Sequence, residues 1–228
     1  MCGRYTLFDS DTLAERFAVP RPSENIRPNY NVAPGQYMPV ITENDDGRQL
    51  EIMKWGLVPG WAKDKNIGYK LINARSESLF EKPAWRTAVK RRRCLVPADG
   101  FYEWQKLTSA SKAPKQPYYI HPKTAGLFAF AGVWDSWKDP DGNDLQTYSI
   151  ITTEPNADMR ALHDRMPVIL YPETEAAWLS PANNDRRNVL ESLLHPYHDN
   201  GLELFPVSRE VNVTANNDAR LIYPMNPK

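Results

Sequence analysis

The second residue of the chain is a cysteine, and its position allows chemistry that an internal cysteine lacks. Cys2 directly follows Met1, and an initiator methionine is commonly removed when the next side chain is small. The product carries a free α-amine and a thiol on adjacent carbons. Its amine can add to an aldehyde and lose water to give an imine, and the thiolate can then close a thiazolidine ring. Cys2 is therefore a candidate for the covalent capture of an aldehyde.

The ionisation of the amine and the thiol limits this chemistry. An α-amine has a reference pKa of about 7.7–8.0, so a minority is neutral at pH 7, whereas a thiol near about 8.5 needs a base or a nearby positive charge. Two other interpretations of Cys2 stay open. It could hydrolyse amides with the α-amine as its base, or it could be a dispensable residue at a frayed terminus. While Met1 remains in place, the ring cannot form.

Three further side chains suit proton transfer or hydrogen bonding. Glu103 stands among aromatic residues, which would desolvate it and move its pKa toward neutrality. His163, one of four histidines, follows an expected short helix and is suited to proton exchange near pH 7. Asn73 cannot titrate and would act by hydrogen bonding. Each also has a plainer interpretation, as a solvent-facing strand residue, a surface or core histidine, and a turn residue.

Arginines and rigid apolar side chains supply candidate contacts to nucleic acid. Arg4, Arg75 and, more weakly, Arg165 are candidate phosphate ligands, because a guanidinium fork matches phosphate oxygens. The basic run at residues 90–93 is the largest local block of positive charge, but a solvated helix end, where cations are favoured, is its preferred interpretation.

Stacking of a base on an aromatic ring contributes about 1–3 kcal/mol and tolerates any sequence. Trp61 and Trp104 are candidate stacking surfaces, and Pro34 in its Gly/Pro loop is a candidate wedge between bases. Trp55 fits a core position better.

The composition bounds the class of protein. Basic and acidic residues number 28 each, so DNA binding would need positive charge concentrated on one face. The two cysteines imply no disulfide framework and suit a reducing compartment. The sequence shows no signal peptide, no apolar run of the ~20 residues that a membrane span needs, and no metal-ligand spacing. We expect a monomer without metal, cofactor or membrane contact, in the cytoplasm at the nucleoid of a bacterium or in the nucleus of a eukaryote.

The pattern of apolar residues and turns predicts one α+β domain over residues 1–228, with a mainly antiparallel sheet curled toward a barrel and flanked by short helices. Strands are expected at residues 37–42, 50–58, 94–105, 117–121, 127–134, 147–153 and 166–170, with a turn at 44–47. Helices are expected at residues 10–17, 83–92, 156–162, 173–179 and 185–195. The first should be capped by Ser10 or Asp11.

Six segments in this order resemble the SOS-response-associated peptidase (SRAP) family, the abasic-site processing proteins. They are Cys2-Gly3-Arg4-Tyr5, Tyr30-Asn31-Val32-Ala33-Pro34-Gly35, Trp55-Gly56-Leu57-Val58-Pro59-Gly60-Trp61 with Ile72-Asn73-Ala74-Arg75, Ala98-Asp99-Gly100-Phe101-Tyr102-Glu103-Trp104, His163-Asp164-Arg165-Met166-Pro167 and Pro206-Val207-Ser208-Arg209. The match extends from Cys2 to about Asn212. One segment would be weak, but the ordered set is specific.

The resemblance implies a DNA-binding cleft and a reversible crosslink between the mature N-terminal cysteine and abasic sites in single-stranded DNA. It assigns Glu103 the acid/base role, including reversal of the crosslink, and His163 the opening of the closed sugar. In many members of the family that the chain resembles, a second aromatic residue follows the position of Trp61, where this chain has Ala62. The aromatic surface available for base stacking there would be smaller, so the type of DNA junction that the protein prefers is not determined.

Three hypotheses follow. The first is covalent capture of abasic single-stranded DNA in the DNA damage response, with possible lyase-like chemistry. The second is a thiol autopeptidase or peptidase, the activity that the family name preserves. The third is a non-covalent single-strand binder whose affinity depends on salt. Most of the preference for the first over the second comes from the resemblance.

Overall fold

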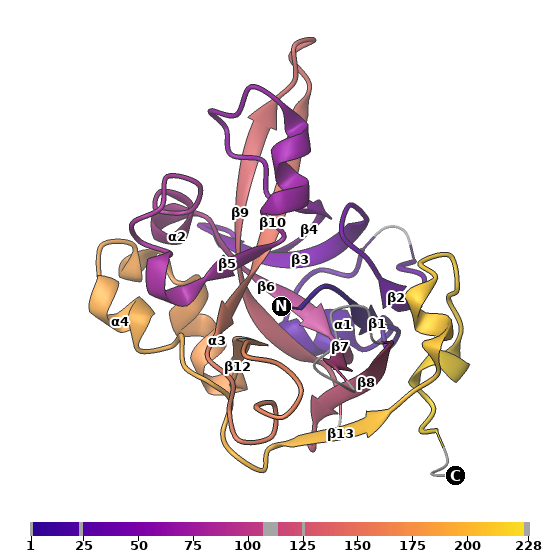
Figure 1. Cartoon of the computed structure of the whole chain (residues 1–228). Helices are drawn as coiled ribbons and strands as arrows, with labels where there is room; N and C mark the ends of the chain where they lie inside the picture. The colour runs from indigo at the N-terminus through magenta and orange to yellow at the C-terminus, as the bar shows by residue number, and fades with distance from the viewer. Residues whose placement is uncertain (1, 23–24, 107–113, 125, 226–228) are drawn as a thin grey trace.

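The computed structural model describes residues 2–22, 25–106, 114–124 and 126–225, which form two β-sheets with short helices on their flanks (Figure 1). The smaller sheet is antiparallel in every pairing. Its strands, in spatial order, are β13 (Leu202–Pro206), β8 (Lys115–Pro122), β7 (Gly100–Lys106), β1 (Tyr5–Leu7) and β2 (Asn29–Val32). The first strand of the chain therefore lies inside this sheet, between β7 and β2.

The larger sheet closes on itself. Its main path runs through β10 (Asp144–Thr153), β4 (Gly47–Trp55), β3 (Tyr37–Asn44), β6 (Arg93–Ala98) and β9 (Phe128–Lys138), and β9 pairs again with β10. The short strands β5 (Asn73–Arg75), β11 (Met166–Pro167) and β12 (Ile169–Leu170) are added at its rim. Among the strands that the structure describes, only the pairings of β10 with β4 and β5 are parallel, so the predicted barrel-like, mainly antiparallel sheet is confirmed.

Short helices cover the flanks, as the α+β prediction requires. The α-helices are α1 (Leu13–Phe17), α2 (Ala88–Arg91), α3 (Pro172–Leu179) and α4 (Arg187–Glu191), and the 3-10 helices are η1 (Lys65–Lys70), η2 (Ser76–Ser78), η3 (Pro181–Asn183), η4 (Arg209–Asn212) and η5 (Ala219–Ile222). Among the described residues, no helix has the length and apolar character to cross a membrane.

The core lies inside the barrel and between the two sheets. All six residues of β6 are buried, because this strand is covered on both faces. Trp55 is buried, and its ring stacks on Tyr148, whose hydroxyl lies 2.8 Å from that of Tyr5. The core interpretation of Trp55 is therefore correct, and a core contact joins β1 to the barrel.

The strand predicted at residues 94–105 is in fact two strands in different sheets. β6 ends at Ala98, and β7 begins at Gly100. Asp99 between them accepts hydrogen bonds from the backbone amides of Phe8 and Asp9, which holds the bend against the start of the chain. A Cβ at Gly100 would lie 2.3 Å from the Tyr119 ring, so this crossing needs a glycine.

Several predicted helices are shorter than expected. Residues 156–162 form turns and no helix, α2 covers only the end of 83–92, and α4 only part of 185–195. Ser10 does not cap α1, because its hydroxyl donates to the Ile26 carbonyl, while Leu13 and Phe17 are buried as expected. The hairpin turn at 44–47 is confirmed. The strands β1, β2, β5 and β13 were not predicted from the sequence.

Candidate active site

Cys2 lies at the entrance to β1, where the smaller sheet meets the rim of the barrel. Pairing of Tyr5 with Phe101 and the hydrogen bond from the Tyr102 amide to the Arg4 carbonyl bring the start of the chain alongside β7, which carries Glu103. The Cys2 side chain is buried, and its Sγ lies 3.9 Å from the Arg4 carbonyl oxygen. The smaller sheet therefore sets the position of the candidate nucleophile.

Asn73 is anchored to Cys2 directly. Its side-chain Nδ2 donates to the Cys2 carbonyl oxygen at 2.8 Å, and the Asn73 side chain is buried. Asn73 begins β5 and pairs with Ile150 in the barrel. One hydrogen bond thus ties the first residue of β5 to the candidate nucleophile across the two sheets.

Glu103 has the electrostatics of a group that exchanges protons near neutrality. Its side chain is buried in β7, and this burial raises its pKa to about 7. A carboxyl with such a pKa can accept and release a proton at pH 7 with little driving force in either direction.

Burial raises the pKa of the Cys2 thiol to about 12, and the negative charge of Glu103 adds to this effect. The resting thiol is therefore protonated at neutral pH. The condition that the sequence posed, a base or positive charge that yields a thiolate, is not met before a substrate is present.

His163 lies in the turn before β11, which is joined to β5 through β10. β10 pairs Thr152 with both Arg75 and Pro167, so the His163 turn and β5 flank one strand. Nδ1 of His163 accepts from the Arg165 amide at 3.0 Å, which places the hydrogen of the neutral ring on Nε2. The Asp164 carboxylate, 2.8 Å from the same nitrogen, would stabilise the protonated ring.

Burial lowers the pKa of His163, so the neutral ring dominates at pH 7. The ammonium of Lys115 acts on the pKa of both His163 and Glu103, in each case downward. Lys115 lies in β8, and no motif in the sequence singles it out. Its charge marks a shared electrostatic environment for the two titratable candidates.

Arg4 and Trp104 form a second group next to Cys2. Arg4 donates through Nη1 to Asn31 Oδ1 at 2.6 Å and to the Val211 carbonyl at 2.8 Å, and its guanidinium lies 5.8 Å from the centre of the Trp104 ring. Trp104 Nε1 donates to Asn212 at 2.8 Å. The segment that carries Val211 and Asn212 therefore holds both an arginine and an aromatic ring beside the nucleophile.

Arg75 and Arg165 form a third group around one carboxylate. Arg165 makes a two-pronged contact with Glu77, at 2.5 and 2.9 Å, and also donates to the Thr152 carbonyl. Both arginines lower the pKa of Glu77, and Arg75 is exposed. A phosphate would have to compete with Glu77 for Arg165, and the sequence did not reveal this competition.

Pro34 and Trp61 lie in different surroundings. The pairing of Tyr5 with Val32 continues two residues later into half-buried Pro34, on the side toward Cys2. Trp61 is 60% exposed, and its Nε1 contacts the Pro83 carbonyl at 3.4 Å. No described contact joins Trp61 to Cys2.

The basic run at residues 90–93 is at least partly structural. Arg93 is buried and donates to the carbonyls of Val89 and Lys90 at the end of α2, as well as to Ser180. The helix-end interpretation therefore holds for Arg93. Within the described part of the chain, no three His, Cys, Asp or Glu side chains gather as a metal ion would need.

Comparisons with known proteins agree on one family. The family model described as SOS response associated peptidase (SRAP) matches residues 1–214. The chain is 47% identical to the abasic site processing protein YoqW of Bacillus subtilis over 97% of this chain and 99% of that protein. It is 33% identical to the abasic site processing protein HMCES of Xenopus tropicalis, covering 86% of this chain and 65% of that protein.

The crystal structure of a protein from Bacteroides thetaiotaomicron superposes with a TM-score of 0.88 at 28% identity, over 99% of this chain and 100% of that one. The chain belongs to the SRAP family of abasic site processing proteins.

Proposed function

We propose that the mature chain, with Met1 removed, captures the aldehyde of an abasic site in single-stranded DNA as a reversible thiazolidine on Cys2. The observation that carries the proposal is that Cys2 is anchored by Asn73 beside a buried carboxylate, Glu103, whose pKa is about 7. The names of the relatives, abasic site processing proteins, favour this substrate over other aldehydes.

The reaction joins an amine, a thiol and an aldehyde and releases one water. The neutral amine of Cys2 attacks C1′ of the open sugar, and the resulting carbinolamine loses its hydroxyl as water once that oxygen is protonated. The sulfur of Cys2 then bonds to the imine carbon, and the thiol proton is transferred to the nitrogen. Atoms balance, and no oxidant or cofactor is needed.

Burial of the Cys2 thiol, which raises its pKa, sets the order of these steps. The amine must act first, because the buried thiol is protonated and a weak nucleophile in the free protein. The imine nitrogen, once protonated, carries a positive charge at a distance of two bonds from the carbon that bears sulfur. This charge favours loss of the thiol proton in the second step.

Glu103 and His163 divide the proton transfers. Glu103 accepts the proton of the attacking amine and returns it to the departing hydroxyl, and it runs the same steps backward during release. Abasic deoxyribose is mostly a closed hemiacetal, and His163, in the minor protonated form that the Asp164 carboxylate stabilises, donates a proton to its ring oxygen as it opens. Arg4, Arg75 and Trp104 hold the flanking phosphates and bases, and Pro34 holds the bases apart.

The test is the intact mass of the purified protein, alone and after mixing with abasic single-stranded DNA. The protein alone should lack Met1, and the mixture should contain a species equal to protein plus DNA minus one water that survives denaturant. Cys2→Ala should abolish this species, whereas Cys94→Ala, at the other buried cysteine, should retain it. Retention of the adduct by Cys2→Ala would overturn the proposal.

A second measurement separates capture from peptidase activity. A thiol peptidase should cleave a peptide in the absence of DNA and lose this activity with a thiol reagent. Glu103→Gln should slow crosslink formation or block its release while single-strand affinity stays near wild type. If both rates equal those of the wild type, Glu103 has no part in the chemistry.

A further inference from the structure

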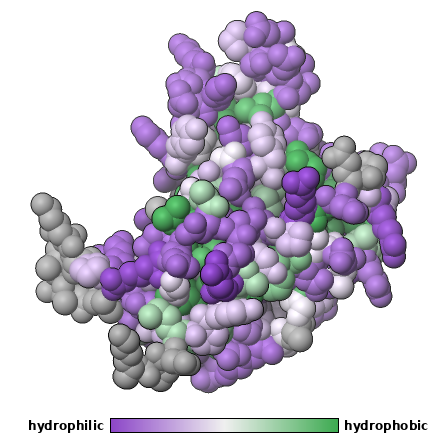
Figure 2. Space-filling model, turned by 90° about the vertical axis from the view of Figure 1, so that its right-hand side faces the viewer, coloured by the Kyte–Doolittle hydropathy of each residue, from purple (hydrophilic) through white to green (hydrophobic). Residues whose placement is uncertain are grey.

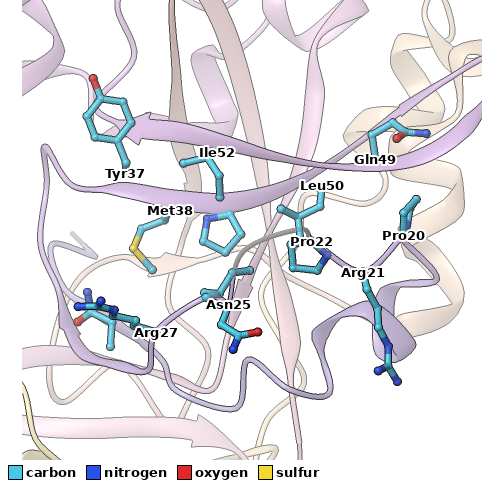
Figure 3. A pocket seen from close by; sticks show the side chains of 13 residues that line it. Pro20, Arg21, Pro22, Asn25, Arg27, Tyr37, Met38, Gln49, Leu50 and Ile52 are labelled. Carbon is cyan, nitrogen blue, oxygen red and sulfur yellow. The ribbon is translucent and has the colours of Figure 1, made fainter.

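A groove away from the candidate active site has the lining of a nucleic-acid track. Its volume is 670 Å³, and it lies between the outer face of the β3–β4 hairpin and the chain segments on either side of residues 23–24 (Figure 3). It is lined by Arg21 and Arg27 and by the exposed side chains of Tyr37 and Ile52. Two arginines and no acidic residue are among its described lining residues. In the sequence Glu24 stands between the two arginines, so residues 21–27 keep a net positive charge, which suits an anionic ligand.

One turn of the chain connects the groove with the candidate active site. Pro34 begins the turn beside Cys2, and Tyr37 at its end starts β3 and lines the groove. Gly35 between them has φ +90°, and a Cβ on it would lie 4.0 Å from both Lys54 Cε and Tyr69 Cε1. Three residues of the chain therefore lead from the proposed wedge to the groove.

An exposed aromatic and cationic band flanks this turn. Tyr37 pairs with Lys54 across the β3–β4 ladder, so the two side chains share one face. Tyr37 and Tyr69 are 58% and 66% exposed. Two tyrosine rings with a lysine beside them offer stacking surfaces and a phosphate contact along one line. On the face shown in Figure 2, hydrophobic patches likewise alternate with hydrophilic side chains.

We propose that this groove binds the flank of the single-stranded DNA that leaves the abasic site past Pro34, with a base on Tyr37 and phosphates on Arg27 and Arg21. The inference rests on the proposed function, because the path of the DNA strand is taken to run from the abasic site at Cys2 past Pro34. An added peptide strand fits the groove less well. Pro39, which lines it within β3, has no amide hydrogen for strand pairing.

The experiment compares abasic oligonucleotides with a short and a long flank on each side. Wild type should bind the long flank more tightly on one side only. Arg21→Glu/Arg27→Glu should lose this gain, with about tenfold weaker binding and a flatter salt dependence by about 1.4 in log–log slope. Tyr37→Ala should lose about five- to tenfold on the same side. Adduct formation with the short oligonucleotide should match wild type in both variants.

The matched control reverses two exposed arginines on another part of the surface. Arg186→Glu/Arg187→Glu makes the same change in net charge at the start of α4, across the molecule from β2 in Figure 1. It should leave the gain from the long flank in place. Equal losses in the control and the groove variant would reduce the effect to net charge and overturn the inference.

A third measurement does not depend on any variant. A photoreactive 5-iodouracil placed at successive positions of the long flank should crosslink on irradiation to a peptide that contains Tyr37. Crosslinks confined to Trp61 or Trp104 would overturn the groove assignment. The same photocrosslinking is done with undamaged oligonucleotides, which cannot form an adduct with Cys2. Failure of Cys2 chemistry would thus be seen separately from failure of the groove to bind DNA.

Discussion

The side-chain amide of Asn73 donates to the backbone carbonyl of Cys2 across 2.8 Å, and this bond links the barrel rim to the second residue of the chain. The two residues are 71 positions apart, and they meet because β5 pairs with β10 while β1 pairs with β7. Free N-termini commonly fray. Here a buried hydrogen bond opposes fraying at the residue whose amine and thiol would react.

Asn73→Ala should slow adduct formation more than it weakens DNA binding. It removes the donor to the Cys2 carbonyl, so the amine samples more orientations, and we expect a rate loss of about 10- to 100-fold. An unsatisfied buried acceptor should also cost about 1–3 kcal/mol of stability. Single-turnover rates and urea unfolding measure the two effects.

A matched control separates positioning from stability. Asn183 is equally buried, and its Nδ2 donates to the Ala177 carbonyl at 2.8 Å on the α3 side of the molecule. Asn183→Ala should lower stability to a similar extent and leave the rate unchanged. A comparable rate loss in both variants would show that Asn73 acts only through the fold.

Asn31→Ala should weaken single-strand binding through Arg4. Asn31 Oδ1 accepts from Arg4 at 2.6 Å, and Asn31 Nδ2 donates to the carbonyls of Val213 and Asn216, so Asn31 fixes the guanidinium and the segment behind it. Affinity should fall about tenfold, and the slope of log affinity against log salt should flatten by about 0.7, the value for one phosphate contact to a single strand. Titrations at several salt concentrations measure both.

A double-mutant cycle tests whether Asn31 acts through Arg4. Arg4→Ala and Asn31→Ala combined should cost little more than Arg4→Ala alone, because both remove the same contact. Fully additive losses would contradict a positioning role for Asn31.

The sequence pointed to the residues of the candidate site more readily than to their spatial arrangement. Cys2, Glu103 and His163 could be chosen because their side chains suit one reaction and stand in ordered motifs. The direction of the Glu103 pKa shift also followed from aromatic neighbours in the sequence. Pairing partners could not be read, because β1 and β5 have three residues each, too short to show alternation.

Long-range polar contacts were equally hidden. Glu77 precedes Arg165 by 88 positions, and nothing in either motif indicates that they meet. Asn31 stands in a motif that was singled out, but its partners Arg4 and Val211 follow only from the pairing of β1 with β2. The break of residues 94–105 into two strands depends on Asp99 bonding to the amides of Phe8 and Asp9, a contact between distant segments.

Glu103→Gln should stabilise the protein at alkaline pH. Burial raises the folded-state pKa of Glu103 from 4.5 to about 7, so the folded state binds its proton more tightly than the unfolded chain. Its contribution is therefore favourable at low pH and is lost as pH rises from about 4.5 to about 7. At pH 8 the variant should be more stable by up to about 3 kcal/mol.

Urea unfolding of both proteins at pH 5 and pH 8 provides the measurement. Other groups titrate in this range, among them Asp99, whose pKa burial raises to about 6, so the quantity to follow is the difference between wild type and variant. This difference should grow from pH 5 to pH 8. A difference that is constant with pH would mean that Glu103 titrates normally in the folded protein.

Glu77→Gln should tighten single-strand binding, the opposite of most substitutions near a binding site. Glu77 holds Arg165 in a two-pronged contact and lies in the field of Arg75, so its carboxylate competes with phosphate for both. Removing the charge should raise affinity several-fold and steepen the salt dependence by about 0.7. Stability should change by less than about 1 kcal/mol, because the Glu77 side chain is 55% exposed.

Glu81→Gln is the matched control. The Glu81 carboxylate is 53% exposed and lies 2.6 Å from Arg187, and its neutralisation should leave affinity unchanged. If both variants raise affinity equally, general charge and not the release of Arg165 is the cause.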